Sequence, residues 1–99
     1  MTPNNAMRPI HPGEILREEM DALGLSARAL AQALDVAPNR ITGILNGERA
    51  LTADTALRLA RYFGTAPEFW LNLQTAYDLR LTQREKGEEI ARHVHPHAA

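Results

Sequence analysis

Residues 26–47, SARALAQALDVAPNRITGILNG, constrain the fold more than any other segment, because they predict two short helices joined by a tight turn. Ser26 can cap the first helix with its hydroxyl, residues 35–37 interrupt the pattern, and Pro38 suits the first position of a second helix. The apolar positions recur at helical spacing: Leu30, Ala31, Leu34, Ile41, Ile44 and Leu45. Two helices this short cannot stand alone, so the flanking segments must hold them.

Three further helices are expected around this pair. The first is expected to begin at residues 11–14 and to end at Gly24, and the second to begin at Thr52 and end at Gly64. The third is expected to begin at residues 65–68 and to end at about Glu85. Thr65 is the expected cap of the last helix. The expected inward positions are Ile15, Leu16, Met20 and Leu23 in the first of the three, and Ala53, Ala56, Leu57, Ala60 and Phe63 in the second. This pattern predicts an all-α, five-helix domain.

The organisation expected from these elements is a single domain with two simple ends. Residues 1–10 hold two prolines without periodicity and are interpreted as an arm that is at least partly mobile. The domain itself is expected at residues 11–86, including a C-terminal dimerisation helix. Residues 87–99 are polar and are expected to form a flexible tail after a frayed helix end.

The last expected helix carries more apolar surface than one core-facing stripe needs. Phe69, Leu73 and Tyr77 mark one face, and we expect Trp70 to lie in the core. The apolar surface is widened by three further residues, Leu71, Leu79 and Leu81. A helix that is apolar on two sides is usually buried on two sides, so we expect these leucines to form a homodimer interface. The alternative is that Leu79 and Leu81 are singly exposed, which is common.

Composition excludes several classes of protein. The 99 residues contain no cysteine, which leaves no disulfide framework and no thiolate metal site. No segment approaches the roughly 20 apolar residues of a membrane span, so we expect a soluble, cytoplasmic protein without a membrane partner. His93, His95 and His97 offer a weak metal-binding pattern, and we predict neither a metal nor another cofactor. No catalytic constellation is present in the sequence, so we expect no enzymatic activity.

Charge and side-chain type point to one surface. The net charge is −1 overall, whereas residues 28–61 hold five arginines against three acidic residues, a balance of +2. Arginine offers a fork of donors that fits phosphates and base edges. The outer face of the second short helix is small or hydrogen-bonding, as a helix in the DNA major groove requires: Pro38, Asn39, Arg40, Thr42, Gly43 and Asn46. The alternative is an ordinary helical hairpin with a solvated face.

The helix pair meets the physical demands of a helix-turn-helix. Ala31 is small where the second helix must cross closely, Asp35 tolerates the unusual backbone angles of the turn, and Val36 and Ile41 are apolar where the turn and second helix need anchors. Residues 25–64 resemble the lambda-repressor-like, or XRE, DNA-binding domain. The segments HPGEILREEM, LAQALDVAPNRITGILNGERALTADTALRLARYFGTAPEFWLNLQ and TAYDLRL are more narrowly similar to HigA-type antitoxins of toxin–antitoxin modules.

This resemblance implies a dimer that binds double-stranded operator DNA, represses its own operon and neutralises a HigB toxin, a RelE-like endoribonuclease that cuts mRNA. It places Pro38, Asn39, Thr42 and Gly43 at base edges, Arg40 at a base or phosphate, Asn46 at a phosphate, and Arg28 and Arg49 beside the groove. Ala37 stands where the family has a capping Ser or Thr, and Pro38 replaces a polar reader. We therefore expect base readout to rest mainly on Asn39 and Arg40.

Two other readings remain at this point. The chain can be a plain phage-type repressor without a toxin partner. It can also be chiefly a toxin-binding module, in which the acidic segment at residues 8–21 and the N-terminal arm meet a basic ribonuclease.

Overall fold

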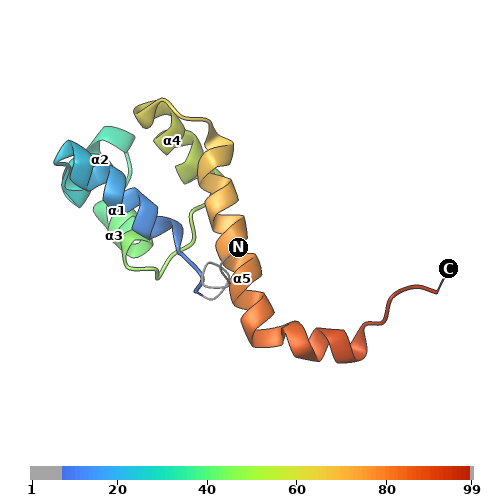
Figure 1. Cartoon of the computed structure of the whole chain (residues 1–99). Coiled ribbons are helices and arrows are strands. Elements are labelled where there is room, and N and C mark those ends of the chain that lie inside the picture. Colours follow the sequence, from blue (N-terminus) through green and yellow to red (C-terminus); the bar gives the residue numbers. More distant parts are fainter. Residues whose placement is uncertain (1–7, 99) are drawn as a thin grey trace.

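The computed structural model describes residues 8–98, and within them it shows five helices and no strand (Figure 1). The helices are α1 (Pro12–Leu23), α2 (Ala27–Leu34), α3 (Pro38–Leu45), α4 (Ala53–Phe63) and α5 (Pro67–His93). The prediction of an all-α, five-helix domain is confirmed. The arm expected at residues 1–10 lies largely outside the described residues, so its mobility stays a prediction.

Local capping chemistry sets most of the helix ends. The Ser26 hydroxyl accepts a hydrogen bond from the Ala29 N–H at 3.0 Å, as predicted, and Thr52 caps α4 in the same way. Gly24 and Gly64 end α1 and α4 in the left-handed conformation. Thr65 does not cap α5, because the cap position is the next residue; its hydroxyl instead accepts a hydrogen bond from the indole of Trp70 at 3.0 Å.

The core lies where α1, α2, α3 and α4 meet the first turns of α5. Its fully or almost fully buried apolar side chains are Leu16, Met20, Leu30, Ala31, Leu34, Ile41, Ile44, Leu51, Ala56, Leu59 and Trp70. Trp70 is completely buried, as expected. Three expected core residues are wrong, since Leu23 is 60% exposed, Leu57 is 61% exposed and Ala53 is also exposed. In α4 the buried face is rotated from the expected one, so Leu59 points inward in place of Leu57.

Close approach between α1 and α3 depends on Gly13. This residue is buried in the first turn of α1, and a Cβ atom there would collide with the backbone carbonyl of Ile44. Because backbone cannot move aside as a flexible side chain can, only glycine lets α1 lie this near to α3. This contact holds α3, the expected recognition helix of the pair, in place against α1.

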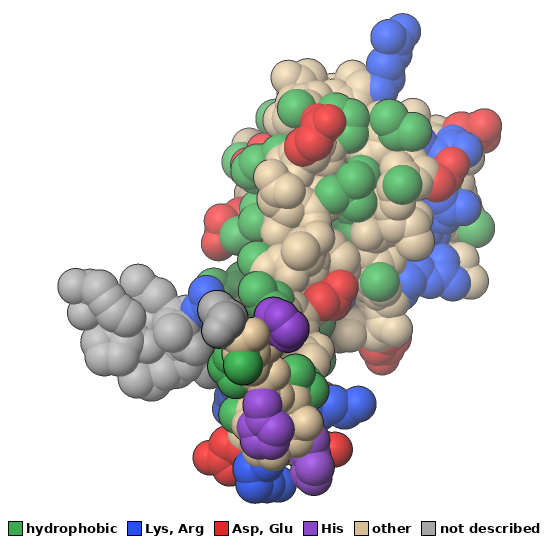
Figure 2. All heavy atoms as spheres, turned by 90° about the vertical axis from the view of Figure 1, so that its right-hand side faces the viewer, with side chains coloured by type: hydrophobic (Ala, Val, Ile, Leu, Met, Phe, Trp, Pro, Cys, Tyr) green, Lys and Arg blue, Asp and Glu red, His purple; other side chains and the backbone are tan. Residues whose placement is uncertain are grey.

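The last helix is longer than the sequence suggests. It was expected to end near Glu85, but α5 continues through Gly87 to His93. Its C-terminal turns project beyond the other four helices (Figure 1), and the molecule measures 52 × 26 × 23 Å. Figure 2 views the molecule from the α5 side. It shows hydrophobic side chains gathered over the body of the molecule, and charged and histidine side chains on the projecting end. The first half of α5 therefore closes the core, and the second half extends outward.

Candidate nucleic-acid interface

Helices α2 and α3 form a helix-turn-helix with a strained but well-bonded turn. Asp35 adopts the left-handed conformation at φ 59°, where L residues other than Asn and Asp are rare. The N–H of Val36 donates to the Ala31 carbonyl at 3.0 Å, and Ala31 is buried where the helices cross. The turn predicted at residues 35–37 is confirmed in position and in its use of Asp35.

One face of α3 is open to solvent. Pro38, Asn39, Thr42 and Asn46 are exposed on it, while Ile41 and Ile44 point inward and are fully buried. Ala37 occupies the cap position without a side-chain hydrogen bond, as its methyl side chain dictates. Pro38 has no N–H group and the Arg40 N–H donates to the Ala37 carbonyl at 3.0 Å, so in this first turn the Asn39 N–H is the group left for an outside acceptor such as a phosphate.

Arg40 points away from this open face and towards α4. Its Nη1 binds the Asp54 carboxylate and lies 3.5 Å from the Thr55 hydroxyl. The same carboxylate oxygen of Asp54 accepts a hydrogen bond from Arg58 Nε at 2.9 Å. Two guanidinium groups therefore share one carboxylate between the recognition helix and α4.

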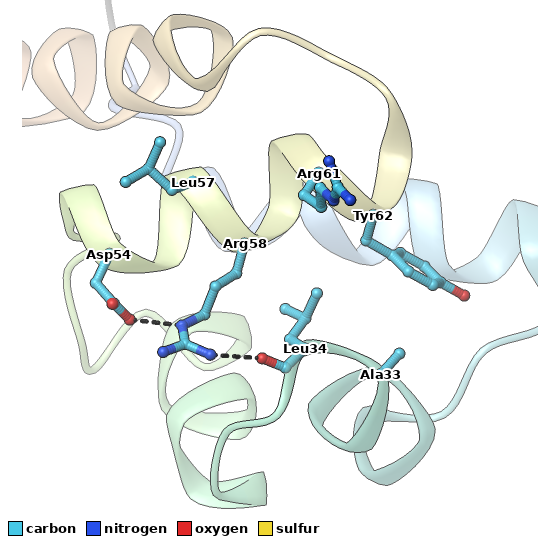
Figure 3. Close-up of a pocket in the computed structure, with 7 residues that line it drawn as sticks. All are labelled: Ala33, Leu34, Asp54, Leu57, Arg58, Arg61 and Tyr62. Atoms are coloured by element: carbon cyan, nitrogen blue, oxygen red, sulfur yellow. Dashed lines mark hydrogen bonds and ion pairs between the residues drawn. The ribbon is translucent and has the colours of Figure 1, made fainter.

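Arg58 connects this pair to the end of α2. Its Nη1 donates to the Leu34 carbonyl at 2.8 Å (Figure 3), and to the Asp35 carbonyl at 3.3 Å, at the C-terminus of α2. A cation there neutralises unpaired carbonyls at the negative end of the helix. Arg58 thus bonds α2 to α4 whether or not Arg40 holds Asp54.

The charges of this network shift one another's titration. Hydrogen bonds from Arg58 first, and then from Arg40, hold the pKa of Asp54 below its ordinary value. In turn, the hydrogen bond to Asp54 raises the pKa of Arg58. Asp54 is consequently ionised throughout the physiological range, and its negative charge stands beside the proposed DNA surface.

Gly43 makes room for the side chain of Arg49. A Cβ atom on Gly43 would lie 3.2 Å from Arg49 Cβ and 3.7 Å from its Cδ and Nε atoms. The Gly43 carbonyl also accepts hydrogen bonds from the N–H groups of Glu48 and Arg49, at 2.9 and 3.1 Å. Gly43, predicted at a base edge, is therefore partly covered by Arg49, which lies across the end of α3.

Two hollows lie beside α3, and the remaining predicted residues line them. One hollow, of about 390 Å³, is lined by Arg40, Arg49, Ala50, Thr52, Asp54, Thr55 and Arg58. The other, of about 430 Å³, is lined by Arg28, Ala31, Gln32, Asp35, Val36 and Pro38. The structure thus gathers the predicted residues along α3 and its two flanks. Asp54 and Arg58 were missed, and their only sequence signal was an acid–base pair four residues apart on α4.

The loop after α3 is fixed to α5 by residues that the sequence reasoning also missed. The buried Gln74 side chain accepts a hydrogen bond from the Leu51 N–H at 2.7 Å and donates to Asp78 at 2.9 Å. His11 caps α1 through Nδ1, which accepts from the Gly13 N–H at 2.9 Å, and its ring meets Tyr77 edge-on at 4.9 Å. These contacts hold the recognition helix in place relative to α5.

The predicted dimerisation residues lie on α5 as expected, with unequal exposure. Leu79 is 59% exposed, whereas Leu71 and Leu81 are half-buried. Phe69, expected on one apolar face of this helix with Leu73 and Tyr77, is 44% exposed and meets the Trp70 ring edge-on. A separate apolar hollow of about 220 Å³ lies between α1 and α5 and includes Ile10, Ile15, Leu73 and Tyr77.

Two searches over the described residues bear on other kinds of site. Among residues 8–98, no group of three or more His, Cys, Asp or Glu side chains is arranged to hold a metal ion. In the same part of the chain, none of the helices is both long and apolar enough to span a bilayer.

Comparison with known proteins identifies the family. The family model described as helix-turn-helix matches residues 16–70. Virulence-associated protein I of Dichelobacter nodosus is 59% identical over 83 residues, which are 83% of this chain and 77% of that protein.

Solved structures agree with this match. An addiction module antidote protein of the HigA family from Coxiella burnetii is 58% identical, with a TM-score of 0.90 over 92% of this chain and 100% of that one. The Pseudomonas aeruginosa antitoxin HigA, solved with the higBA promoter, is 42% identical, with a TM-score of 0.89 over 92% of this chain and 100% of that one. The helix-turn-helix, the five-helix architecture and these similarities together show that the chain belongs to the HigA family of helix-turn-helix antitoxins.

Proposed function

We propose that the protein is an antitoxin that binds operator DNA and represses its own operon. The observation that carries this proposal is the open, hydrogen-bonding face of α3. This helix is part of a helix-turn-helix whose turn is hydrogen-bonded and whose two helices are packed on the core. A helix of this kind fits the major groove, where its N-terminal residues meet base edges. A relative with the same fold over its whole length was solved with promoter DNA, which supports the same use here.

The residues proposed to contact DNA fall into two main groups, those that face base edges and those that face phosphates. Asn39 and Thr42 are exposed on α3 and are proposed to meet base edges, with Asn39 suited to adenine. Pro38 is proposed to give apolar contact. Arg28, Asn46 and Arg49 are proposed to bind phosphates on either side, which fixes the register but carries no sequence information. Gly43 acts by admitting Arg49, and Arg40 is proposed to reach DNA after leaving Asp54.

We further propose a homodimer formed through α5. Leu79 and Phe69 are exposed large apolar residues on this helix, and Leu71 and Leu81 extend the surface. Two α3 helices related by a two-fold axis would enter successive major grooves about 34 Å apart on a palindromic site.

The DNA half of the proposal is tested by gel shift on the duplex upstream of the protein's own gene. Asn39→Ala and Arg40→Ala are each expected to weaken binding, because each removes a side chain proposed to touch DNA, and Arg40→Ala less so because Arg40 must first leave Asp54. Gln83→Ala, an exposed change on the far part of α5, serves as the control and should bind like the unchanged protein. Normal affinity in both variants, with unfolding midpoints unchanged, would contradict the assignment.

The antitoxin half rests on membership of the HigA family and concerns a HigB-like toxin of the RelE-type, mRNA-cleaving class. Co-expression with the toxin encoded beside this gene should relieve the growth arrest that the toxin causes. If growth stays arrested while the chain still binds its upstream DNA, the antitoxin half is wrong and a plain transcriptional repressor remains.

A further inference from the structure

We propose that Asp54 limits the affinity of the protein for DNA by holding Arg40 as an internal stand-in for a backbone phosphate. This inference rests on the proposed DNA-binding function and names a residue that governs it. Asp54 lies on α4 outside the recognition helix, yet its carboxylate binds Arg40 of that helix. A guanidinium bound to a carboxylate must exchange that partner before it can bind a phosphate oxygen.

The exchange is possible because the ion pair is accessible. The Arg40 side chain is 33% exposed and that of Asp54 is 54% exposed, so neither charge is enclosed by the core. Their hollow also contains Arg49 and the start of α4, and it opens beside the proposed DNA face. A DNA phosphate that approaches this hollow therefore meets three arginines and one competing carboxylate.

Arg40 and Arg58 are held differently, and this difference makes Arg40 the group that moves. Without the Asp54 charge, Arg58 keeps its hydrogen bonds to the carbonyls of Leu34 and Asp35. Arg40 would keep only a 3.5 Å contact with the Thr55 hydroxyl. Removal of the Asp54 charge is therefore expected to release Arg40 towards DNA while Arg58 continues to join α2 to α4 (Figure 3).

The expected size follows from the strength of such pairs. An exposed ion pair is weak, and its loss changes an equilibrium constant by roughly fivefold at most. Arg40 binds the same phosphate in the DNA complex of both proteins, so the slope of log K against log salt should change little. Because phosphates carry no sequence information, affinity should rise for specific and unrelated duplexes alike.

The test compares Asp54→Asn with Asp21→Asn by fluorescence anisotropy, on the upstream duplex and on a shuffled duplex over a range of salt concentrations. Asp21 is exposed on α1, so its variant changes the net charge equally without touching Arg40. Asp54→Asn should bind both duplexes roughly two- to fivefold more tightly than Asp21→Asn, with a similar salt slope. Equal or weaker binding by Asp54→Asn would overturn the proposal.

A double-mutant cycle separates competition from simple support of the fold. Arg40→Gln should weaken DNA binding more in the Asp54→Asn background than in the unchanged protein, because Arg40 is already released there. Equal losses in the two backgrounds would contradict the competition. If the unchanged protein fails to bind its upstream duplex, the proposed function itself is wrong, which is a different result from an unaltered cycle.

A second readout needs no substitution. The carboxyl resonance of Asp54 in the unchanged protein, followed by NMR across acidic pH, should titrate at higher pH in the DNA complex than in the free protein. The reason is that Asp54 loses Arg40 and gains a neighbouring phosphate. A titration of Asp54 that does not move on DNA binding would overturn the proposal even if Asp54→Asn does not fold.

Discussion

At the scale of single residues, the charge contacts around α3 depend on how the helices pack. Asp54 illustrates this, since the sequence reasoning missed it, whereas the structure shows it in the first turn of α4 and bound to Arg40. Its role depends on where the fold places α4 relative to α3, which no local pattern encodes. The same is true of Arg49, whose position over Gly43 follows from the loop that returns it to α3.

Ala37 leaves α3 without a side-chain cap, and this gives a first prediction. Ala37→Ser should raise the free energy of unfolding by about 1 kcal/mol, because a serine hydroxyl can accept from a free N–H of the first turn. Urea unfolding measures the change. Ala33→Ser, an exposed change within α2, is the control and should be neutral or slightly destabilising. No gain at position 37 would mean that these N–H groups already have a partner.

His11 makes stability depend on pH in a narrow window. Burial lowers its pKa below the ordinary value of 6.5, against a backbone hydrogen bond at Arg49 that raises it. The unfolded chain therefore binds this proton more readily than the folded one, and the free energy of unfolding should fall as pH drops through about 6.5. Protonated Nδ1 also cannot accept the Gly13 N–H. Urea unfolding at pH 7.5 and 5.0 measures the loss.

Two variants identify His11 as the source. His11→Asn can still cap α1 through its amide oxygen and should flatten the dependence, whereas His95→Asn, in the exposed tail, should retain it. The titration of Glu14 and Asp54 does not contribute to the loss of stability in this pH range. The pKa of each carboxyl is lowered, by Arg8 for Glu14 and chiefly by Arg58 for Asp54, so their contributions are lost only at more acidic pH. An unchanged slope in His11→Asn would contradict the assignment.

At the scale of helices, the sequence predicts starts and stops well where caps are local. Ser26, Thr52 and Gly24 carry their own chemistry, and α2 and α4 begin, and α1 ends, where these residues indicate. Burial was harder to predict. Leu57 and Leu59 both fit an apolar stripe, and only the position of the neighbouring helices, which α2 and α5 provide, decides which of them points inward.

The end of α5 was missed because its last turns lack an apolar stripe. Charged residues surround Gly87 in EKGEEIARH, and glycine inside a helix usually lowers helicity. The helix nevertheless continues there, and a Cβ atom on Gly87 would meet no other atom within 4 Å. Burial played no part in this extension, which rests on backbone hydrogen bonds and a polar surface.

This extension gives a prediction at the scale of the element. Gly87→Ala should strengthen the projecting part of α5 by roughly 0.5–1 kcal/mol, because alanine has the higher helix propensity and has room here. Amide hydrogen exchange of residues 83–91 should show increased protection. The control, Gly64→Ala, should destabilise the fold because that residue has φ 75°. Absent protection at residues 83–91 in both proteins would place the helix end near Glu85.

For the whole molecule, the family and the five-helix fold could be predicted from sequence because specific blocks run through most of the chain. The oligomeric state could not be settled in the same way, since exposed leucines occur on monomers as well. In the structure Leu79 is exposed on the body side of α5 and Ile90 on its projecting end. These two residues therefore offer a matched comparison.

The proposed dimer gives the prediction at this scale. Leu79→Arg should shift sedimentation towards a monomer, because a desolvated charge would be placed between two apolar helix faces. It should leave the helical content and the unfolding midpoint of the monomer unchanged, since Leu79 is outside the core. Ile90→Arg is the control and should remain dimeric. A Leu79→Arg protein that sediments as the unchanged one would rule out this part of α5 as the interface.

The most direct measurement of the central claim is the ratio of two dissociation constants. The unchanged protein is titrated, at one fixed salt concentration, against the duplex upstream of its own gene and against the same duplex with its sequence shuffled. A sequence-reading helix α3 predicts preference for the upstream duplex by a factor of about 10³ or more, and Asn39→Ala should reduce that factor. Equal dissociation constants for the two duplexes would contradict the account.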